Sequence, residues 1–221
     1  MECPYTAQFP LMKILAVSDQ VEDRISELVP RGHFKGAGLV LGCGDLPYAY
    51  LEYLVTLMNI PVFYVPGNHD PAYTSERSDG HAAGCTNLDL RTARFQGVLI
   101  AGFGGSIRYR PGAVNQYSQS EAFVRAIQMM PALLLNRLRH GRTLDILISH
   151  SPPFGVQDDD SSAHRGLKAI NWLIEWAQPR LHLHGHLHNM RRNLDPVTTN
   201  IGETAVLNVF PHRLVDFPSG Q

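Results

Sequence analysis

Three residues that can bind a metal ion or move a proton stand in a row at Asn68, His69 and Asp70. They follow the apolar run 60–65 and the turn at 66–67. A short apolar run ended by Pro-Gly is typical of a buried strand, and ligands of open α/β sheets bind at the carboxyl ends of strands. The stretch could also be only a polar turn, because Asn and Asp are common turn formers.

Other polar groups that follow apolar runs favour chemistry over a turn. They are Ser18-Asp19, Gly44-Asp45, Ser149-His150 and Gly185-His186-Leu187-His188, after residues 14–17, 39–41, 146–148 and 181–183. Carboxylates, imidazoles and one amide suit two divalent transition metals better than Ca²⁺ or Mg²⁺, which prefer oxygen ligands throughout. Histidines at 182, 184, 186 and 188 are a further compositional sign of a metal site.

The apolar periodicity predicts strands at 12–17, 37–41, 60–65, 97–102, 144–149, 181–183, 205–209 and 213–217. It predicts helices at 21–29, capped by Ser18 or Asp19, and at 48–58, 118–139 and 170–177, with a kink or break at Pro131. Alternating strands and helices indicate a parallel sheet, which brings Asp19, Asp45 and Asn68 to one edge. The late short strands suggest a second sheet, and residues 71–94 show no period and are interpreted as a loop at the rim of the site.

Length and composition favour one domain over residues 12–221, preceded by an extension at 1–11. The formal net charge of -1 provides no basic field for nucleic acid or for an anionic membrane surface. The three cysteines have no disulfide or zinc spacing, and no apolar run is long enough to span a bilayer. We therefore expect a cytoplasmic protein with no membrane contact, and nucleic acid is a disfavoured partner.

In order and composition, Asp19, Gly44-Asp45, Gly67-Asn68-His69-Asp70, Ser149-His150 and Gly185-His186-Leu187-His188 resemble the signature of calcineurin-like metallophosphoesterases. The resemblance implies a four-layer αββα sandwich, with two mixed sheets flanked by helices, around a dimetal site. It implies that Asp45 bridges the ions, that Asn68, His150 and His186 complete one of them, and that Asp19 and His188 serve the other. It also implies that His69 faces the substrate and that Asp70 orients His69.

Such a site hydrolyses a phosphodiester or phosphomonoester with a metal-activated water, while His69 assists the leaving group. Mn²⁺ is the first candidate for the two ions, and Fe, Zn²⁺, Ni²⁺ and Mg²⁺ stay open. The expected substrate is a phosphorylated small molecule or a nucleotide, which the sequence does not specify further.

The first motif departs from the family pattern, because Asp19-Gln20-Val21 stands where Asp-Xaa-His is usual. Valine cannot bind a metal, so the ion at Asp19, Asp45 and His188 could be weakly held, or Gln20 or Glu22 could complete it. An alternative hypothesis is a catalytically weak metal-binding regulatory or scaffold protein of the same fold. The presence of His69, which has no structural duty without catalysis, argues against that alternative.

Other residues are candidates for substrate contacts. Arg108 and Arg110 follow Gly104-Gly105 and could bind a phosphate, or they could be ordinary surface arginines. His164 is a further candidate from the loop before the last helix. His182 and His184 are expected to be satisfied residues of the core or supports of the metal ligands.

Overall fold

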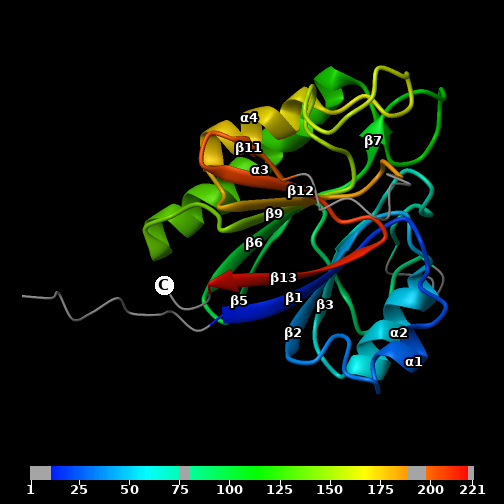
Figure 1. Ribbon diagram of the computed structural model, residues 1–221. Coiled ribbons are helices and arrows are strands. Elements are labelled where there is room, and N and C mark those ends of the chain that lie inside the picture. The colour runs from blue at the N-terminus through cyan, green and yellow to red at the C-terminus, as the bar shows by residue number, and fades with distance from the viewer. Residues whose placement is uncertain (1–10, 75–79, 189–197, 219–221) are drawn as a thin grey trace, which may run out of the picture.

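The strands form two sheets that pack face to face in the computed structural model, which describes residues 11–74, 80–188 and 198–218 (Figure 1). The five-stranded sheet has the order β13–β1–β2–β3–β4, with β1 (Leu11–Val17), β2 (Ala37–Cys43), β3 (Val62–Val65), β4 (Thr86–Asn87) and β13 (His212–Pro218). The six-stranded sheet has the order β11–β12–β10–β9–β6–β5, with β5 (Thr92–Phe95), β6 (Val98–Phe103), β9 (Ile146–Ser149), β10 (Leu181–His184), β11 (Thr198–Ile201) and β12 (Thr204–Asn208). A small separate pair consists of β7 (Ser106–Ile107) and β8 (Gln116–Tyr117).

Helices cover the outer face of each sheet (Figure 1). The helices α1 (Ile25–Leu28) and α2 (Tyr48–Met58) lie on the five-stranded sheet, and α3 (Gln119–His140) and α4 (Lys168–Ala177) lie on the six-stranded sheet. Both sheets are mixed, because β13, β11 and β5 each run antiparallel to a neighbour in otherwise parallel sheets. The predicted four-layer αββα sandwich is confirmed.

Alternating side chains along the strands build three apolar layers. Along β1, Ile14 and Ala16 join the cluster between the sheets, whereas Leu15 and Val17 join the cluster beneath α1 and α2. On the other side, α3 and α4 pack onto the six-stranded sheet through a third cluster that includes Leu147. Burial on both faces explains why the central strands read as continuous apolar runs.

The parallel strands β1, β2 and β3 are neighbours, and their carboxyl ends meet at one edge of the sheet. Val17 is opposite Gly42, and Cys43 is opposite Val65. The residues that follow these strands are Asp19, Asp45 and Asn68, so their predicted meeting at one edge is confirmed.

The first helix differs from its prediction. It begins at Ile25 and is four residues long, with Arg24 before it and no side-chain cap. Ser18 and Asp19 do not cap it, because the Ser18 hydroxyl donates to the Asp19 carboxylate and Asp19 accepts the His186 N–H instead.

Two further predictions are corrected. Residues 71–94 are not a structureless loop, since β4 and the start of β5 lie within them. The helix α3 continues through Pro131, so of the predicted kink or break the break is wrong, and the helix starts with a capping box between Ser118 and Glu121.

The strand β11, which was not predicted, has the polar sequence Thr-Thr-Asn-Ile. Residues 1–10 of the predicted extension lie outside the described residues, and β1 begins at Leu11. In the described part of the chain, no helix combines the length and the apolar character needed to cross a membrane.

Candidate metal centre

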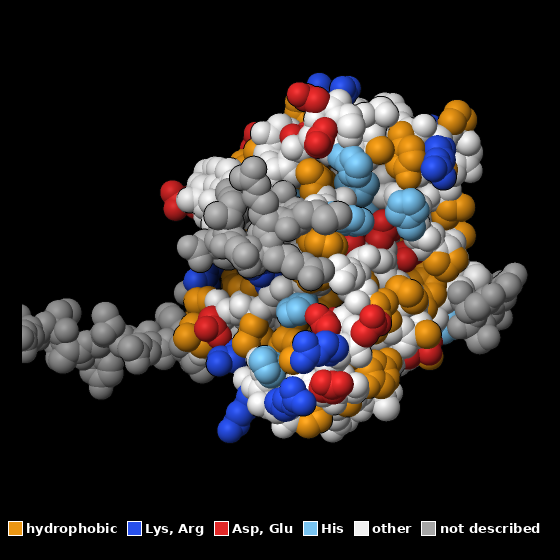
Figure 2. Space-filling model, turned by 45° about the vertical axis from the view of Figure 1, so that its right-hand side comes forward, with side chains coloured by type: hydrophobic (Ala, Val, Ile, Leu, Met, Phe, Trp, Pro, Cys, Tyr) orange, Lys and Arg blue, Asp and Glu red, His pale blue; other side chains and the backbone are white. Residues whose placement is uncertain are grey.

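The candidate metal centre lies where the carboxyl ends of strands from both sheets face each other. Histidine side chains gather around acidic side chains on this face of the molecule (Figure 2). Asp19, Asp45 and His186 all have left-handed backbone, with φ of 64°, 55° and 70°. Non-glycine residues rarely adopt this conformation, and such positions concentrate at functional sites.

Four side chains with lone pairs converge in one half of the centre, which we call the inner half: Asp45, Asn68, His150 and His186. The Nε2 atom of His150 lies 3.0 Å from Asn68 Oδ1 and 3.3 Å from Asp45 Oδ2. It also lies 3.0 Å from His186 Nδ1. The two imidazoles are buried, and the side chain of Asp45 is 10% exposed.

Backbone carbonyls fix which imidazole nitrogen faces the inner half. His150 Nδ1 donates to the Cys43 carbonyl at 2.9 Å, and His186 Nε2 donates to the Ala163 carbonyl at 2.7 Å. With those nitrogens protonated, His150 Nε2 and His186 Nδ1 direct their lone pairs at each other. Such an arrangement needs a cation between them, and metal-ligating histidines are usually held through the other ring nitrogen in this way.

The electrostatics of the inner half also call for positive charge. Burial opposes a charged His150, but the carboxylates of Asp45 and Asp19 outweigh burial and raise the pKa of His150 to about 9. For Asp45, burial is outweighed by His150 and by the His69 N–H, and its pKa falls to about 2. Burial and the nearby His150 lower the pKa of His186 to about 3. The carboxylates of Asp45 and Asp19 therefore favour positive charge beside His150 and His186.

Asp45, His150 and His186 can place one ligand atom each within 4.8 Å of the others, which is the geometry of a metal site. The donors are one carboxylate oxygen and two imidazole nitrogens, and the Asn68 amide oxygen adds a fourth. This donor set fits a divalent transition metal better than a hard cation that takes only oxygen.

The other half of the centre, which we call the outer half, consists of Asp19 and His188. His188 Nε2 lies 3.3 Å from Asp19 Oδ1, and its ring stacks on Phe210 at 4.7 Å. The His188 side chain is 53% exposed, whereas that of Asp19 is 1% exposed. The hydrogen bond to Asp19 raises the pKa of His188. For Asp19, burial is outweighed by the contact with His188 and the charge of His150, so its pKa is lowered.

Val21 and Glu22 add no ligand to the outer half in this structure. Val21 is half-buried against the apolar cluster beneath α2. The Glu22 carboxylate accepts the Arg24 N–H and lies 3.9 Å from His212. Glu22 therefore points to a different part of the surface, and the outer half has fewer protein ligands than the inner half.

His69 stands over the centre, and Asp70 lies beneath it. The His69 N–H donates to Asp45 at 2.8 Å, while its imidazole, 67% exposed, lies 4.0 Å from Asp45 Oδ2. The hydrogen bonds of the Asp70 carboxylate go to the N–H groups of Gly67 and Asp45, at 2.7 and 2.9 Å. In this structure Asp70 thus positions the turn that holds Asp45 rather than the His69 ring. Burial raises the pKa of Asp70 to about 6.

Between the two candidate arginines lies Tyr109, a residue that the sequence analysis missed. Its hydroxyl accepts a hydrogen bond from Asn68 Nδ2 at 3.2 Å, so it lies at the inner half. Arg108 points the other way and pairs with Glu121 on α3 at 2.7 Å. Arg110 lies over the Tyr109 ring at 5.5 Å. Tyr109, and not Arg108, is therefore the side chain of this segment that contacts a ligand of the centre.

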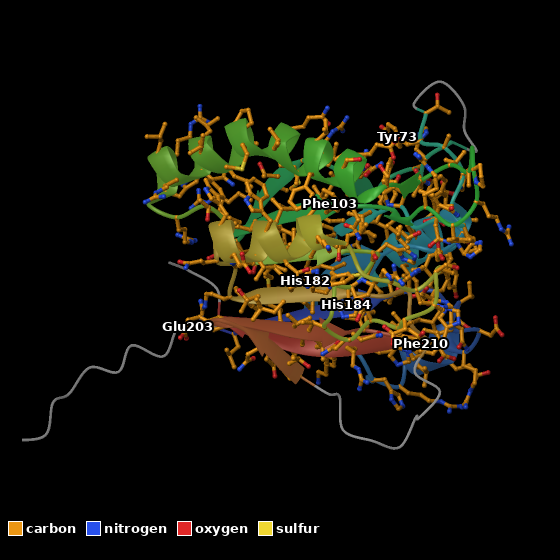
Figure 3. All side chains as sticks on the ribbon, turned by 90° about the horizontal axis from the view of Figure 1, so that it is seen from above. Tyr73, Phe103, His182, His184, Glu203 and Phe210 are labelled. Carbon is orange, nitrogen blue, oxygen red and sulfur yellow. The ribbon has the colours of Figure 1, made fainter. Side chains whose placement is uncertain are left out.

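The three other histidines considered in the sequence analysis, His164, His182 and His184, lie in two different places. His164 reaches the rim of the centre, where its ring centroid is 5.3 Å from that of His186 and Ser161 holds its Nδ1. His182 and His184 lie on β10 inside the layers, below α4 (Figure 3). His184 Nε2 bonds Gln157 at 3.0 Å, and His184 is a satisfied core residue as expected. His182 Nε2 bonds Ser149 at 2.8 Å, but its buried Nδ1 has no hydrogen-bond partner among the described residues, so His182 is only partly satisfied.

Close approach of backbone segments explains the glycines of the motifs. A side chain at Gly44, whose φ is 87°, would place a Cβ 2.6 Å from His150 Nδ1. A side chain at Gly185 would collide with Ser18 and Asp19. These glycines are the one signal by which sequence could have located the backbone that clamps the ligands.

The two-sheet fold and the candidate metal site agree with the result of a comparison with protein families. Residues 12–190 match the calcineurin-like phosphoesterase family, and the chain belongs to that family.

Other proteins are similar to this chain over most of its length. The uncharacterized protein MJ1162 of Methanocaldococcus jannaschii is 27% identical, with 90% of this chain and 88% of that protein aligned. The UPF0046 protein K07C11.7 of Caenorhabditis elegans is 21% identical over 93% of this chain and 73% of its own length. The crystal structure of TT1561 of Thermus thermophilus superposes with a TM-score of 0.60 at 18% identity, covering 90% of this chain and 89% of TT1561, and it shows the same fold.

Proposed function

We propose that the protein is a metal-dependent phosphoesterase that hydrolyses a phosphodiester or phosphomonoester. The observation that carries the proposal is the convergence of His150 Nε2, His186 Nδ1 and Asn68 Oδ1, each fixed by a hydrogen bond elsewhere on the same side chain. Family membership supports the same reaction class. Divalent ions held in such a centre supply an activated water and positive charge for phosphate oxygens.

Two divalent ions are proposed, with Mn²⁺ as the first candidate and Fe, Zn²⁺, Ni²⁺ or Mg²⁺ as alternatives. The inner half holds one with Asn68, His150 and His186, and Asp45 is shared. Asp19 and His188 hold the other, more weakly, because Val21 brings no imidazole and His188 is half-exposed.

The protein's own side chains then bind the substrate and move the proton. His69 lies at the open side of Asp45 with its imidazole free to donate a proton to the leaving oxygen, a role commonly worth about 10² to 10⁴ in rate. Tyr109 accepts from Asn68 and keeps its own O–H proton for a phosphate oxygen. His164 at the rim is placed to contact the rest of the substrate. Arg108, held by Glu121, and Arg110 are proposed only for larger substrates that extend past Tyr109.

A phosphorylated small molecule or a nucleotide is the proposed substrate. The net charge of -1 supports a compact anionic substrate over a nucleic acid, which needs a basic surface. Few, unpatterned cysteines support a cytoplasmic location.

The test is hydrolysis of bis- and mono-p-nitrophenyl phosphate, cyclic nucleotides and single-stranded DNA with added Mn²⁺, for the parent and for His69→Ala. We expect His69→Ala to lower turnover by about 10² or more while bound metal stays at the parent level. The matched control is His33→Ala, at an exposed position away from the centre, with parent activity. Loss of metal in His69→Ala would mean that His69 is a ligand.

A metal-binding regulatory or scaffold protein is a second candidate function, favoured by the small number of protein ligands in the outer half. Under this second candidate, the protein should bind one ion tightly and hydrolyse no phosphoester of the panel. Activity that depends on His69 would remove this candidate.

A further inference from the structure

The helix α3 has an apolar face that packs on nothing in the described molecule. Its inner face buries Ala122, Ala126, Met129 and Leu133. Its outer face carries Val124, Ile127, Pro131, Leu134 and Leu138, which we call the α3 outer stripe. The stripe is well exposed, with Val124 at 56%, Ile127 at 57% and Leu138 at 83%. The helix forms an outer edge of the molecule, with side chains standing away from α4 and the sheets (Figure 3).

The spacing of the stripe is that of a helix-pairing seam. Counted from Val124, its members lie at +3, +7, +10 and +14, which is the heptad pattern of positions that meet a second helix. Ordinary surface helices place polar residues opposite the buried face, whereas this helix is apolar on both faces. A helix of this kind is expected to be covered on both sides.

The stripe is complementary to itself when a second α3 runs in the opposite direction. Val124 and Leu138 are each seven residues from Pro131, so a twofold axis beside Pro131 places one over the other. Leu138, the most exposed of the large apolar side chains among the described residues, would then reach the partner's groove of about 510 Å³ beside Val124. Arg108, Tyr117, Glu121 and Gln128 line the same groove.

The charges at the ends of α3 favour the same orientation. Glu121 lies in the first turn, and Arg137, Arg139 and His140 lie in the last turn. An antiparallel pair brings the acidic end of each helix to the basic end of the other, and it also sets the two helix dipoles head to tail. A parallel pair would bring like charges together. An interface in which the same patch occurs on both sides is the commonest way in which a chain forms a dimer.

We propose that the α3 outer stripe is a homodimer interface in which α3 packs antiparallel against α3 of a second copy of this chain. The interface lies on the outside of the six-stranded sheet, away from the metal ligands. Arg108, which lines the groove, is the one residue that the interface shares with the substrate contacts proposed above. The metal ligands and His69 take no part in the interface, so neither proposal requires the other.

Sedimentation equilibrium of the full chain from about 1 to 100 µM tests the proposal. The parent should form a dimer. Ile127→Glu and Leu138→Glu should each weaken it by about 100-fold or more, because each buries an unpaired charge. Leu214→Glu, at a side chain that is 41% exposed on β13, is the matched control and should leave the dimer intact. Parent-like circular dichroism shows that the variants fold. A monomeric parent at 100 µM, or a dimer that persists in both α3 variants, would overturn the proposal.

Cross-linking tests the orientation, in a Cys3→Ser, Cys85→Ser background and with a short bis-maleimide. A mixture of Val124→Cys and Leu138→Cys proteins should yield a covalent dimer at least about tenfold faster than either protein alone. Faster linking of Val124→Cys to itself would indicate a parallel pair and would contradict the antiparallel arrangement.

Discussion

The inner and outer halves of the metal centre are built in different ways. In the inner half, two buried imidazoles are clamped through their second nitrogen by the carbonyls of Cys43 and Ala163. In the outer half, the half-exposed imidazole of His188 lies beside the buried carboxylate of Asp19 and stacks on the ring of Phe210. Clamped ligands lose little freedom when an ion binds, so the difference predicts unequal affinity for two ions within one centre.

Removing one imidazole from each half should produce the largest contrast. His150→Ala should lower kcat/KM by about 10³-fold or more, because several kcal/mol of charge stabilisation are lost with the ion. His188→Ala should lower it by about 10- to 100-fold at limiting Mn²⁺ and by less at saturating Mn²⁺. Steady-state kinetics across a Mn²⁺ series measures both. Equal losses at every metal concentration would mean that the two halves are equivalent.

Adding a ligand to the outer half should reduce the difference in metal affinity between the two halves. Val21→His places an imidazole two residues after Asp19 and should raise the affinity for the outer ion by about 10- to 100-fold. Calorimetric metal titration measures it, with Val21→Ala as the control that brings no ligand atom. An unchanged titration would show that position 21 stays turned toward the apolar cluster beneath α2.

The Tyr109 hydroxyl belongs to the inner half alone. Tyr109→Phe removes one hydrogen bond, worth about 0.5 to 1.5 kcal/mol, so kcat/KM should fall by about 2- to 10-fold with metal affinity nearly unchanged. Tyr53→Phe, on the exposed side of α2, is the matched control. Activity equal to that of the parent would place Tyr109 outside the substrate site.

The last prediction concerns the stability of the fold rather than activity, and it rests on His182 in β10. Burial, with the neighbouring His184, lowers the pKa of His182 well below its usual value, and His182 Nδ1 has no hydrogen-bond partner among the described residues. Below about pH 6.5, His182 of the unfolded chain binds a proton that the buried His182 of the folded chain does not bind. Because of this residue, the free energy of unfolding decreases as the pH is lowered, by about 1.4 kcal/mol per pH unit. His182→Gln should remove that slope from urea unfolding between about pH 6.5 and 5, measured with chelator. An identical pH dependence in the two proteins would contradict the cause assigned here.

Much of this centre could be predicted from sequence, because its ligands follow apolar runs that had to become neighbouring strands. Asp45, Asn68, His150 and His186 meet where strand order and the family motif place them. The carbonyls that hold the imidazoles could not be predicted individually, since a carbonyl such as that of Ala163 carries no mark of its own in a sequence. The motif glycines mark only where backbone segments approach the ligands closely.

Local patterns also misled the sequence analysis where tertiary contacts outweighed them. The periodicity after Ser18 suggested a capped helix, but Asp19 is drawn to the His186 N–H and the helix starts only at Ile25. Arg108 and Arg110 drew attention by their charge, whereas the uncharged Tyr109 between them contacts a ligand.

The inner half should bind its ion before the outer half does. Anomalous diffraction at the manganese edge, from crystals grown with one equivalent of Mn²⁺, tests this order of binding. We expect a single strong peak among Asp45, Asn68, His150 and His186, with a second peak between Asp19 and His188 only at higher Mn²⁺. A first peak between Asp19 and His188, with the inner half empty, would contradict it.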